Sequence, residues 1–220
     1  MKRLHWIACA VALGGFLFGF DSGVISGCEE AIQAEYALSP FWHGLVVSGA
    51  LIGTIFGALA AGALCDRWGR RPTLMLMGWL FLISAAGCAA SPCHALWGPQ
   101  VLGWMRFIGG IAIGGVSVAV PMYIAEIAPP DERGRLVLAN QFCIVIGIVV
   151  SYVSNYCIAR WVPLSAGVKW RAMLGAECLP VIAYMLALLT VPESPHQARA
   201  DAGVPLFTRR NLRPLLLCFT

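Results

Sequence analysis

The chain has 220 residues, of which 59% are hydrophobic and only 12% are charged, whereas about a quarter of an ordinary soluble domain is charged. This composition excludes a soluble core, because each membrane-spanning helix takes roughly 20 apolar residues and several such stretches would fill most of the chain. The net charge of +4 is modest and basic residues are not interleaved with aromatic ones, which excludes a nucleic-acid partner. Nine cysteines are scattered without metal-ligand spacing, so no metal, disulfide framework or cofactor is indicated.

Six apolar stretches follow one another along the chain and predict an all-α membrane protein with six transmembrane helices. They cover residues 4–26, 41–64, 73–91, 99–125, 136–159 and 170–191. Each is long enough to cross a hydrocarbon core about 30 Å thick. The connections are short and polar, and the first of them, from Gly27 to Pro40, is acidic. The four histidines lie at or near the ends of the stretches, so no catalytic cluster is expected and the chain is not predicted to be an enzyme.

Basic residues are distributed unequally between the two ends of these stretches. Arg160, Lys169 and Arg171 fall on one side, eleven others fall on the opposite side, and Arg106 lies within a stretch. Short loops rich in Lys and Arg stay in the cytoplasm. We therefore expect a multi-pass protein of the cell membrane, embedded in its lipid bilayer, with both chain ends cytoplasmic.

Three ionisable residues, Asp21, Arg106 and Glu177, lie within the apolar stretches. A charge at the bilayer centre costs ~2.5–3.5 kcal/mol or more, so such residues are functional candidates. With a helical rise of ~1.5 Å per residue, each lies roughly 8–10 Å from the outer end of its stretch. An arginine beside a carboxylate favours the ionised form, and a desolvated carboxylate without that partner takes up a proton.

The common depth of these charges therefore predicts a proton-coupling switch between Asp21 and Arg106. The alternative is a static ion pair that joins two helices. Glu177 either faces a water-filled cleft or bonds to another helix.

Glycines recur on helix faces in two of the stretches. Gly49, Gly53 and Gly57 are spaced by four residues, and the stretch 99–125 contains Gly109, Gly110, Gly114 and Gly115. Small residues let helices approach closely in lipid, although membrane helices are also rich in small residues in general.

We divide the chain into a six-helix bundle, 1–195, and a cytoplasmic linker with the start of an incomplete seventh helix, 196–220.

The turn after the second stretch carries a specific motif. Residues 62–71 read G-x-x-x-D-R-x-G-R-R, with Asp66, Arg67, Gly69, Arg70 and Arg71 at its defined positions. The motif resembles the signature loop of the major facilitator superfamily. Its acidic and basic side chains are suited to charge-assisted bonds with neighbouring helix ends. The alternative is that the arginines only anchor the turn on the cytoplasmic side.

Further segments resemble the sugar porters of that superfamily, in the family's order. They are 14–27, 121–134, 140–142, 170–175 and 192–195. The resemblance implies the N-terminal six-helix bundle of a major-facilitator fold, built as a 3+3 inverted repeat. Transporters of this family have twelve spans, so it also implies a missing C-terminal half or a second half-transporter as partner.

The resemblance assigns roles to residues of the proton and sugar sites. Asp21 matches the acidic position of the proton symporters, and Arg106 matches the arginine thought to pair with it. Phe18 matches an aromatic residue that lines the cleft. The expected sugar-binding residues on the fifth stretch are Gln141, Ile144 and Ile148. Amides both donate and accept hydrogen bonds and so suit sugar hydroxyls, but an interhelical contact of Gln141 is the alternative.

The resemblance also implies a cytoplasmic gate. Glu126, Arg133 and Glu193 match members of a charge network that includes Arg70 and Arg71. One position departs from the family, because His196 stands where an arginine is usual, which predicts a weaker or pH-sensitive network.

The expected function is secondary active transport of a monosaccharide or polyol with protons, by alternating access. A facilitative uniporter and a non-transporting sugar sensor are the alternatives. Hexose, pentose and inositol all remain open as substrates, because the second half would supply most of the polar sugar contacts.

Overall fold

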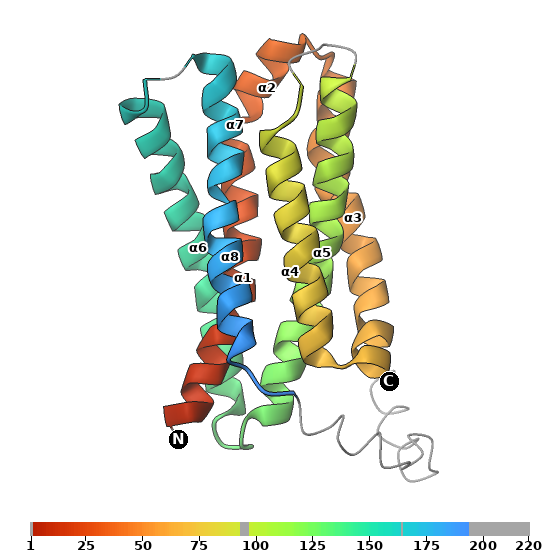
Figure 1. Ribbon diagram of the computed structural model, residues 1–220, viewed down its shortest axis with the longest axis vertical. Helices are drawn as coiled ribbons and strands as arrows, with labels where there is room; N and C mark the ends of the chain where they lie inside the picture. Colours follow the sequence, from red (N-terminus) through yellow and green to blue (C-terminus); the bar gives the residue numbers. More distant parts are fainter. Residues whose placement is uncertain (1, 93–96, 164, 194–220) are drawn as a thin grey trace.

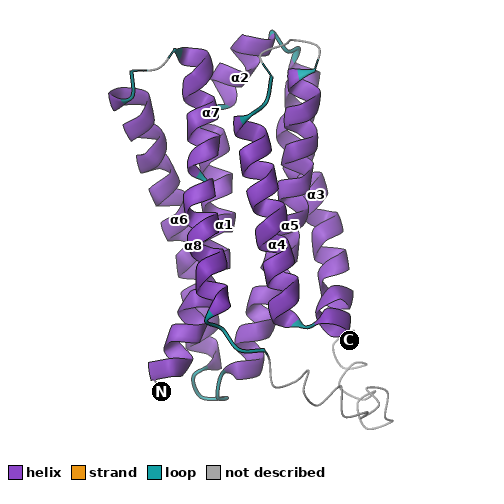
Figure 2. Cartoon of the chain, in the orientation of Figure 1, coloured by secondary structure: helices purple, strands orange, loops and turns teal. Residues whose placement is uncertain are grey.

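The computed structural model describes residues 2–92, 97–163 and 165–193, which form a bundle of long helices (Figure 1). Its helices are α1 (Lys2–Ser26), α2 (Glu29–Tyr36), α3 (Pro40–Trp68), α4 (Arg70–Ala89), α5 (Gly98–Ile127), α6 (Arg133–Trp161), α7 (Ala166–Ala176) and α8 (Cys178–Leu189). These ranges contain no strand (Figure 2). Six helical segments, the last of them made of α7 and α8, are long and apolar enough to cross a membrane. The all-α prediction with six spans is therefore confirmed, while the expected seventh helix lies outside the described residues.

The helices extend past the apolar stretches that predict them. The second stretch, expected over 41–64, continues as α3 to Trp68, because the polar residues of the basic turn prolong the helix beyond the hydrocarbon region. Gly69 then ends α3 and precedes α4, with φ 102° and ψ 161°. A backbone of positive φ is open to glycine at little cost, so the motif glycine is what permits this abrupt change of direction.

Two features differ from the sequence-based expectation. The connection 27–40 contains the short helix α2, and the sixth span is interrupted at Glu177 instead of running through 170–191 as one helix. Pro180 explains the interruption, because it has no N–H to donate to the carbonyl group of Ala176 and its ring crowds that carbonyl. The N–H of Glu177 bonds to the carbonyl oxygen of Leu174 at 3.2 Å, a tightened turn at the end of α7.

The most extensive contacts join α3 with α5 and α1 with α6. Both pairings relate one helix of spans 1–3 to one helix of spans 4–6, as a two-fold relation between the two units requires. Glycines form these contacts: a Cβ atom at Gly53 would collide with the carbonyl oxygen of Phe107, and one at Gly19 with that of Ile144. The predicted packing role of the glycines is thus confirmed for Gly53. Elsewhere on the same helix, a Cβ atom at Gly62 would meet no atom within 4 Å.

The bundle contains two clusters of buried apolar residues, one toward each of its ends. One cluster packs α1, α4, α5 and α8 around Tyr123 and Tyr184. The second cluster surrounds α2 and α7 and includes Ile32, Tyr36 and Trp170. Figure 1 shows α2 at one end of the bundle, and the beginning of α1, the α3–α4 turn and the end of α8 at the other. We call these the α2 end and the terminal end.

Candidate functional site

A site of three charged residues lies inside the bundle, between α1, α5 and the α7–α8 junction. Asp21, Arg106 and Glu177 are 5%, 4% and 3% exposed. The guanidinium group of Arg106 donates to both carboxylate oxygens of Asp21, with Nη2 3.2 Å from Oδ2. This bidentate geometry is the strongest form of a carboxylate–arginine bond. Two residues 85 positions apart in the chain, expected at equal depth, are therefore in direct contact.

Glu177 is the third charged residue of this site. Its carboxylate lies within electrostatic reach of both Asp21 and Arg106. Within the described residues, Oε1 of Glu177 and Nε of Arg106 are buried without a hydrogen-bond partner. A buried polar group without a partner costs ~1–3 kcal/mol. These two atoms are therefore available to bind a proton or to form a different pairing among the three charged residues. Two acids beside one guanidinium allow the arginine to neutralise either of them.

The predicted sugar-binding residues occupy different surroundings. Phe18 is half-buried and packs against the first apolar cluster. Gln141 is exposed, makes no hydrogen bond within the described residues, and borders an open apolar hollow of about 550 Å³. Ile144 and Ile148 are half-buried, and their backbones contact the glycines of α1. The structure thus leaves Gln141 available to a ligand but joins it to no other polar side chain.

The basic turn forms a network at the terminal end. Arg70 is buried and donates from Nε and Nη2 to Oε1 of Glu126, at 3.0 and 2.9 Å. Its Nη2 is also 3.2 Å from Oδ1 of Asp66, and its Nη1 donates to the carbonyl oxygen of Cys65 at 2.8 Å. One guanidinium group thereby joins the ends of α3 and α5.

Arg71 extends this network to the end of α8. Its backbone N–H donates to Oε1 of Glu193 at 3.2 Å, and its guanidinium group donates to the carbonyl oxygens of residues 188 and 189. Arg67 and Arg133 are exposed and form no ion pair within the described residues. Of the gate residues predicted from the sequence, Asp66, Arg70, Arg71, Glu126 and Glu193 are brought together around Gly69, while Arg67 and Arg133 are not.

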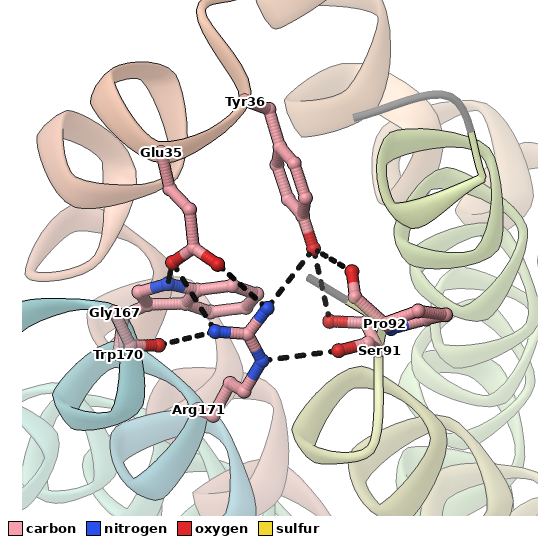
Figure 3. Close-up of polar contacts among 7 residues, drawn as sticks. All are labelled: Glu35, Tyr36, Ser91, Pro92, Gly167, Trp170 and Arg171. Atoms are coloured by element: carbon pink, nitrogen blue, oxygen red, sulfur yellow. Dashed lines mark hydrogen bonds and ion pairs between the residues drawn. The ribbon is translucent and has the colours of Figure 1, made fainter. Parts of the chain in front are cut away.

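Sequence reasoning did not identify two further polar contacts. At the terminal end, the Tyr123 hydroxyl donates to the carbonyl oxygen of Pro192 at 2.6 Å. At the α2 end, Glu35 accepts hydrogen bonds from Nε1 of Trp170 at 2.6 Å and from Nη2 of Arg171 at 2.8 Å (Figure 3). A tyrosine inside an apolar span and an acidic residue near the membrane surface were the only signals available in the sequence.

Burial raises the pKa of Glu35, but the hydrogen bonds from Arg171 and Trp170 and the charge of Arg171 lower it by more. The pKa of this carboxyl group therefore lies below its ordinary value, and the group is held in its ionised form. The described residues contain no group of three side chains suited to hold a metal ion.

Comparison with known proteins supports one family. Residues 7–200 match the family described as sugar (and other) transporter. The glucose transporter GlcP of Staphylococcus epidermidis is 41% identical over 184 residues, which are 84% of this chain and 39% of GlcP. The arabinose-proton symporter of Bacillus subtilis is 39% identical over 211 residues, which are 93% of this chain and 44% of the symporter.

A solved structure gives the same result. The proton:xylose symporter XylE from E. coli, a major facilitator superfamily protein bound to 6-bromo-6-deoxy-D-glucose, superimposes with a TM-score of 0.85 at 36% identity. The alignment covers 91% of this chain and 47% of XylE. The chain spans less than half of the length of each of these relatives.

Proposed function

Because the chain belongs to the sugar transporter family of the major facilitator superfamily, we propose that it forms the N-terminal half of a proton-coupled sugar transporter of the cell membrane. The observation that carries this proposal is the buried bidentate pair of Asp21 and Arg106. A uniporter needs no ionisable group at that depth, where a charge is costly. Relatives named for their substrates transport glucose, arabinose or xylose, so a monosaccharide or polyol is the proposed substrate class.

Proton coupling would proceed through exchange of partners at the buried charge site. While Arg106 binds Asp21, the carboxylate is stabilised in its ionised form. If a change of conformation draws Arg106 toward Glu177, Asp21 is left in apolar surroundings, where the protonated form is favoured. The free Nε of Arg106 and the free oxygen of Glu177 provide for such an exchange. Proton occupancy would then bias which side of the membrane the sugar cleft opens to.

The sugar would bind on the face of the bundle that carries Phe18 and Gln141. Aromatic rings cover the apolar face of a sugar and an amide pairs with its hydroxyl groups. Ile144 and Ile148 would complete the apolar wall one and two turns from Gln141. Six further spans, in the same chain or a separate one, would supply the opposite wall of the cleft.

The network around Gly69 would act as the cytoplasmic gate. Lys and Arg are concentrated at the terminal end, which favours the cytoplasmic side for both chain ends. In the outward-facing state the bonds of Arg70 and Arg71 would hold the inner mouth closed. Alternating access would then be a rocking of the two halves around a site near the midplane.

Transport by a completed protein tests the proposal. The chain would be joined to the part of the Bacillus subtilis arabinose-proton symporter that it does not match, and reconstituted in vesicles. We expect Asp21→Asn to abolish sugar accumulation driven by a proton gradient but to preserve exchange of labelled sugar. Asp131→Asn, at an exposed loop position, is the matched control and should retain both activities.

Uphill accumulation by the Asp21→Asn protein would refute the coupling role of Asp21. Proton uptake on sugar addition separates the remaining functions: a symporter takes up protons with the sugar, a uniporter moves sugar alone, and a sensor moves neither.

A further inference from the structure

The short helix α2 lies across one end of the bundle (Figure 1). Its inward face is formed by Cys28, which immediately precedes the helix, and by Ile32 and Tyr36, and these three residues are 0%, 0% and 4% exposed. A spacing of four residues places side chains on one face of a helix. Glu29 and Glu30 are exposed, so the helix is amphipathic and its apolar side faces the interior of the bundle.

The inward face of α2 is part of a block of apolar side chains that also includes residues of the neighbouring spans, and we call this block the apolar plug. Its buried members are Phe20, Val24, Cys28, Ile32, Tyr36, Val46, Cys88, Leu102, Trp170, Met173 and Leu174. Each charged residue has a plug member about one turn further toward α2 on its own span, namely Val24 for Asp21, Leu102 for Arg106, and Met173 for Glu177. With a rise of ~1.5 Å per residue, the plug is roughly 10 Å deep between Asp21 and Cys28.

One arginine fastens α2 to the rest of the bundle (Figure 3). Nη1 and Nη2 of Arg171, on α7, donate to the two carboxylate oxygens of Glu35 at 3.2 and 2.8 Å. Its Nε donates to the carbonyl oxygen of Ser91, just after α4, at 3.0 Å, and its Nη2 donates to the Tyr36 hydroxyl at 3.3 Å. The guanidinium group also lies over the ring of Trp170, 4.2 Å from its centroid.

Two other residues of α2 also contact the rest of the bundle. Nε2 of His43, on α3, lies 3.1 Å from Oε1 of Glu29. Tyr36 donates from its hydroxyl to the carbonyl oxygen of Pro92 at 2.9 Å. Its ring lies so close to the backbone of Gly98, at the start of α5, that a Cβ atom there would collide with it. A helix of eight residues is not stable by itself in water. Its position therefore depends on these contacts.

We propose that Arg171 is a latch that holds α2 on the apolar plug and thereby seals the buried charge site against water at the α2 end. This inference rests on the proposed function only in taking protons as what the seal excludes, since the seal itself belongs to this chain. A lysine would not replace the arginine, because the latch uses the planar fork of the guanidinium group to reach Glu35 and Ser91 together. Protons would then reach Asp21 from the sugar cleft and not directly through the bundle end.

The chain contains its own reporter for this seal. Cys28 lies in the plug directly beneath α2, and its thiol contacts the carbonyl oxygen of Trp170 and the sulfur of Met173, each at 3.7 Å. Burial raises the pKa of this thiol to about 12, with a smaller lowering by Arg106 and a smaller raising by Glu177. Only the thiolate reacts with a maleimide, so Cys28 reacts slowly while the plug is closed.

The test measures the rate at which N-ethylmaleimide labels Cys28 in the whole chain, reconstituted in liposomes at neutral pH, with the other eight cysteines substituted by alanine. This reagent crosses membranes, so the orientation of the chain does not matter. We expect Arg171→Gln to raise the rate by about tenfold or more, because a thiol freed from burial regains its ordinary pKa. Arg171→Lys should raise it in the same direction.

Two controls distinguish displacement of α2 from general unfolding of the protein. Arg160→Gln removes an exposed arginine near the same end of the bundle and should leave the Cys28 rate unchanged. A second version keeps only Cys65, which is fully buried at the terminal end, and Arg171→Gln should not increase its labelling.

An unchanged Cys28 rate in Arg171→Gln would overturn the proposal. So would a parallel rise at Cys28 and Cys65, which indicates general unfolding, or an equal rise in Arg160→Gln, which indicates a bulk charge effect. None of these measurements needs a sugar, a proton gradient or a second half. Failure of the latch is therefore distinguishable from failure of the transport proposal.

Discussion

A methyl group added at Gly53 tests whether backbone contact holds α3 against α5. The new Cβ atom would collide with the carbonyl oxygen of Phe107, and it would lie 3.0 Å from the nitrogen of Ile111 and 3.1 Å from Cα of Gly110. All three neighbours are backbone atoms, which cannot rotate away as a side chain can. The two helices must therefore separate, and the contacts along their interface are weakened together.

The magnitude follows from two opposing terms. Overpacking a close interface costs ~1–3 kcal/mol, and rigid backbone neighbours place this site near the upper limit. Alanine gains ~1 kcal/mol over glycine in intrinsic helix propensity. We expect Gly53→Ala to lower the free energy of unfolding by about 2 kcal/mol. Gly62→Ala, on the same helix but with no atom within 4 Å of the new Cβ, should instead raise it by up to ~1 kcal/mol.

The assay is reversible unfolding of the chain in mixed micelles by increasing dodecyl sulfate, followed by far-ultraviolet circular dichroism. The free energies of wild type, Gly53→Ala and Gly62→Ala are compared under identical lipid composition. Equal free energies for the two variants, within about 0.5 kcal/mol, would refute the inference that backbone contact at Gly53 joins α3 to α5.

Two further predictions use the same unfolding measurement. The pKa of Glu35 lies below its ordinary value of 4.5, so the stabilisation by its bonds to Arg171 and Trp170 is complete above that pH and is lost as the pH falls through the lowered pKa. Glu35→Gln should cost about 1.5–3 kcal/mol at neutral pH and should flatten this loss in acid; parallel pH profiles for wild type and variant would contradict the assignment. Tyr123→Phe removes the hydroxyl that binds the carbonyl oxygen of Pro192 and should cost about 1 kcal/mol, with faster proteolysis after α8; an unchanged cleavage rate would show that this bond does not fix the chain there.

The contact between Asp21 and Arg106 could be anticipated because the helical rise converts sequence position into depth. Charged residues at equal depth in one bundle tend to face its interior and pair with one another, since a lone charge that faces lipid is costly. The same reasoning placed Glu177 nearby, but it did not show the break between α7 and α8. A proline in an apolar run is compatible with a kinked helix as well as with two helices, and only the surrounding packing decides between them.

Side-chain directions were the part that sequence alone could not supply. Arg67 and Arg70 belong to one motif, but the chain reverses at Gly69, so Arg70 turns into the bundle while Arg67 stays exposed. The helix α2 was missed for a related reason. Half of its eight residues are polar, and it is stabilised by Trp170 and Arg171, which lie about 135 positions later in the chain.

The separation of 85 residues between Asp21 and Arg106 has a consequence for how the protein is made. Ribosomes add about 5–20 residues per second, so roughly 4–17 s pass between synthesis of the acid and synthesis of its arginine. During that interval Asp21 has no partner arginine, so placing the first span in the bilayer is more costly than it is in the finished bundle. The partner that docks on its glycine face, α6, is translated later still. The bundle is therefore completed only with its second three spans, and a chain that ends before α5 would hold Asp21 in α1 without the arginine that pairs with it.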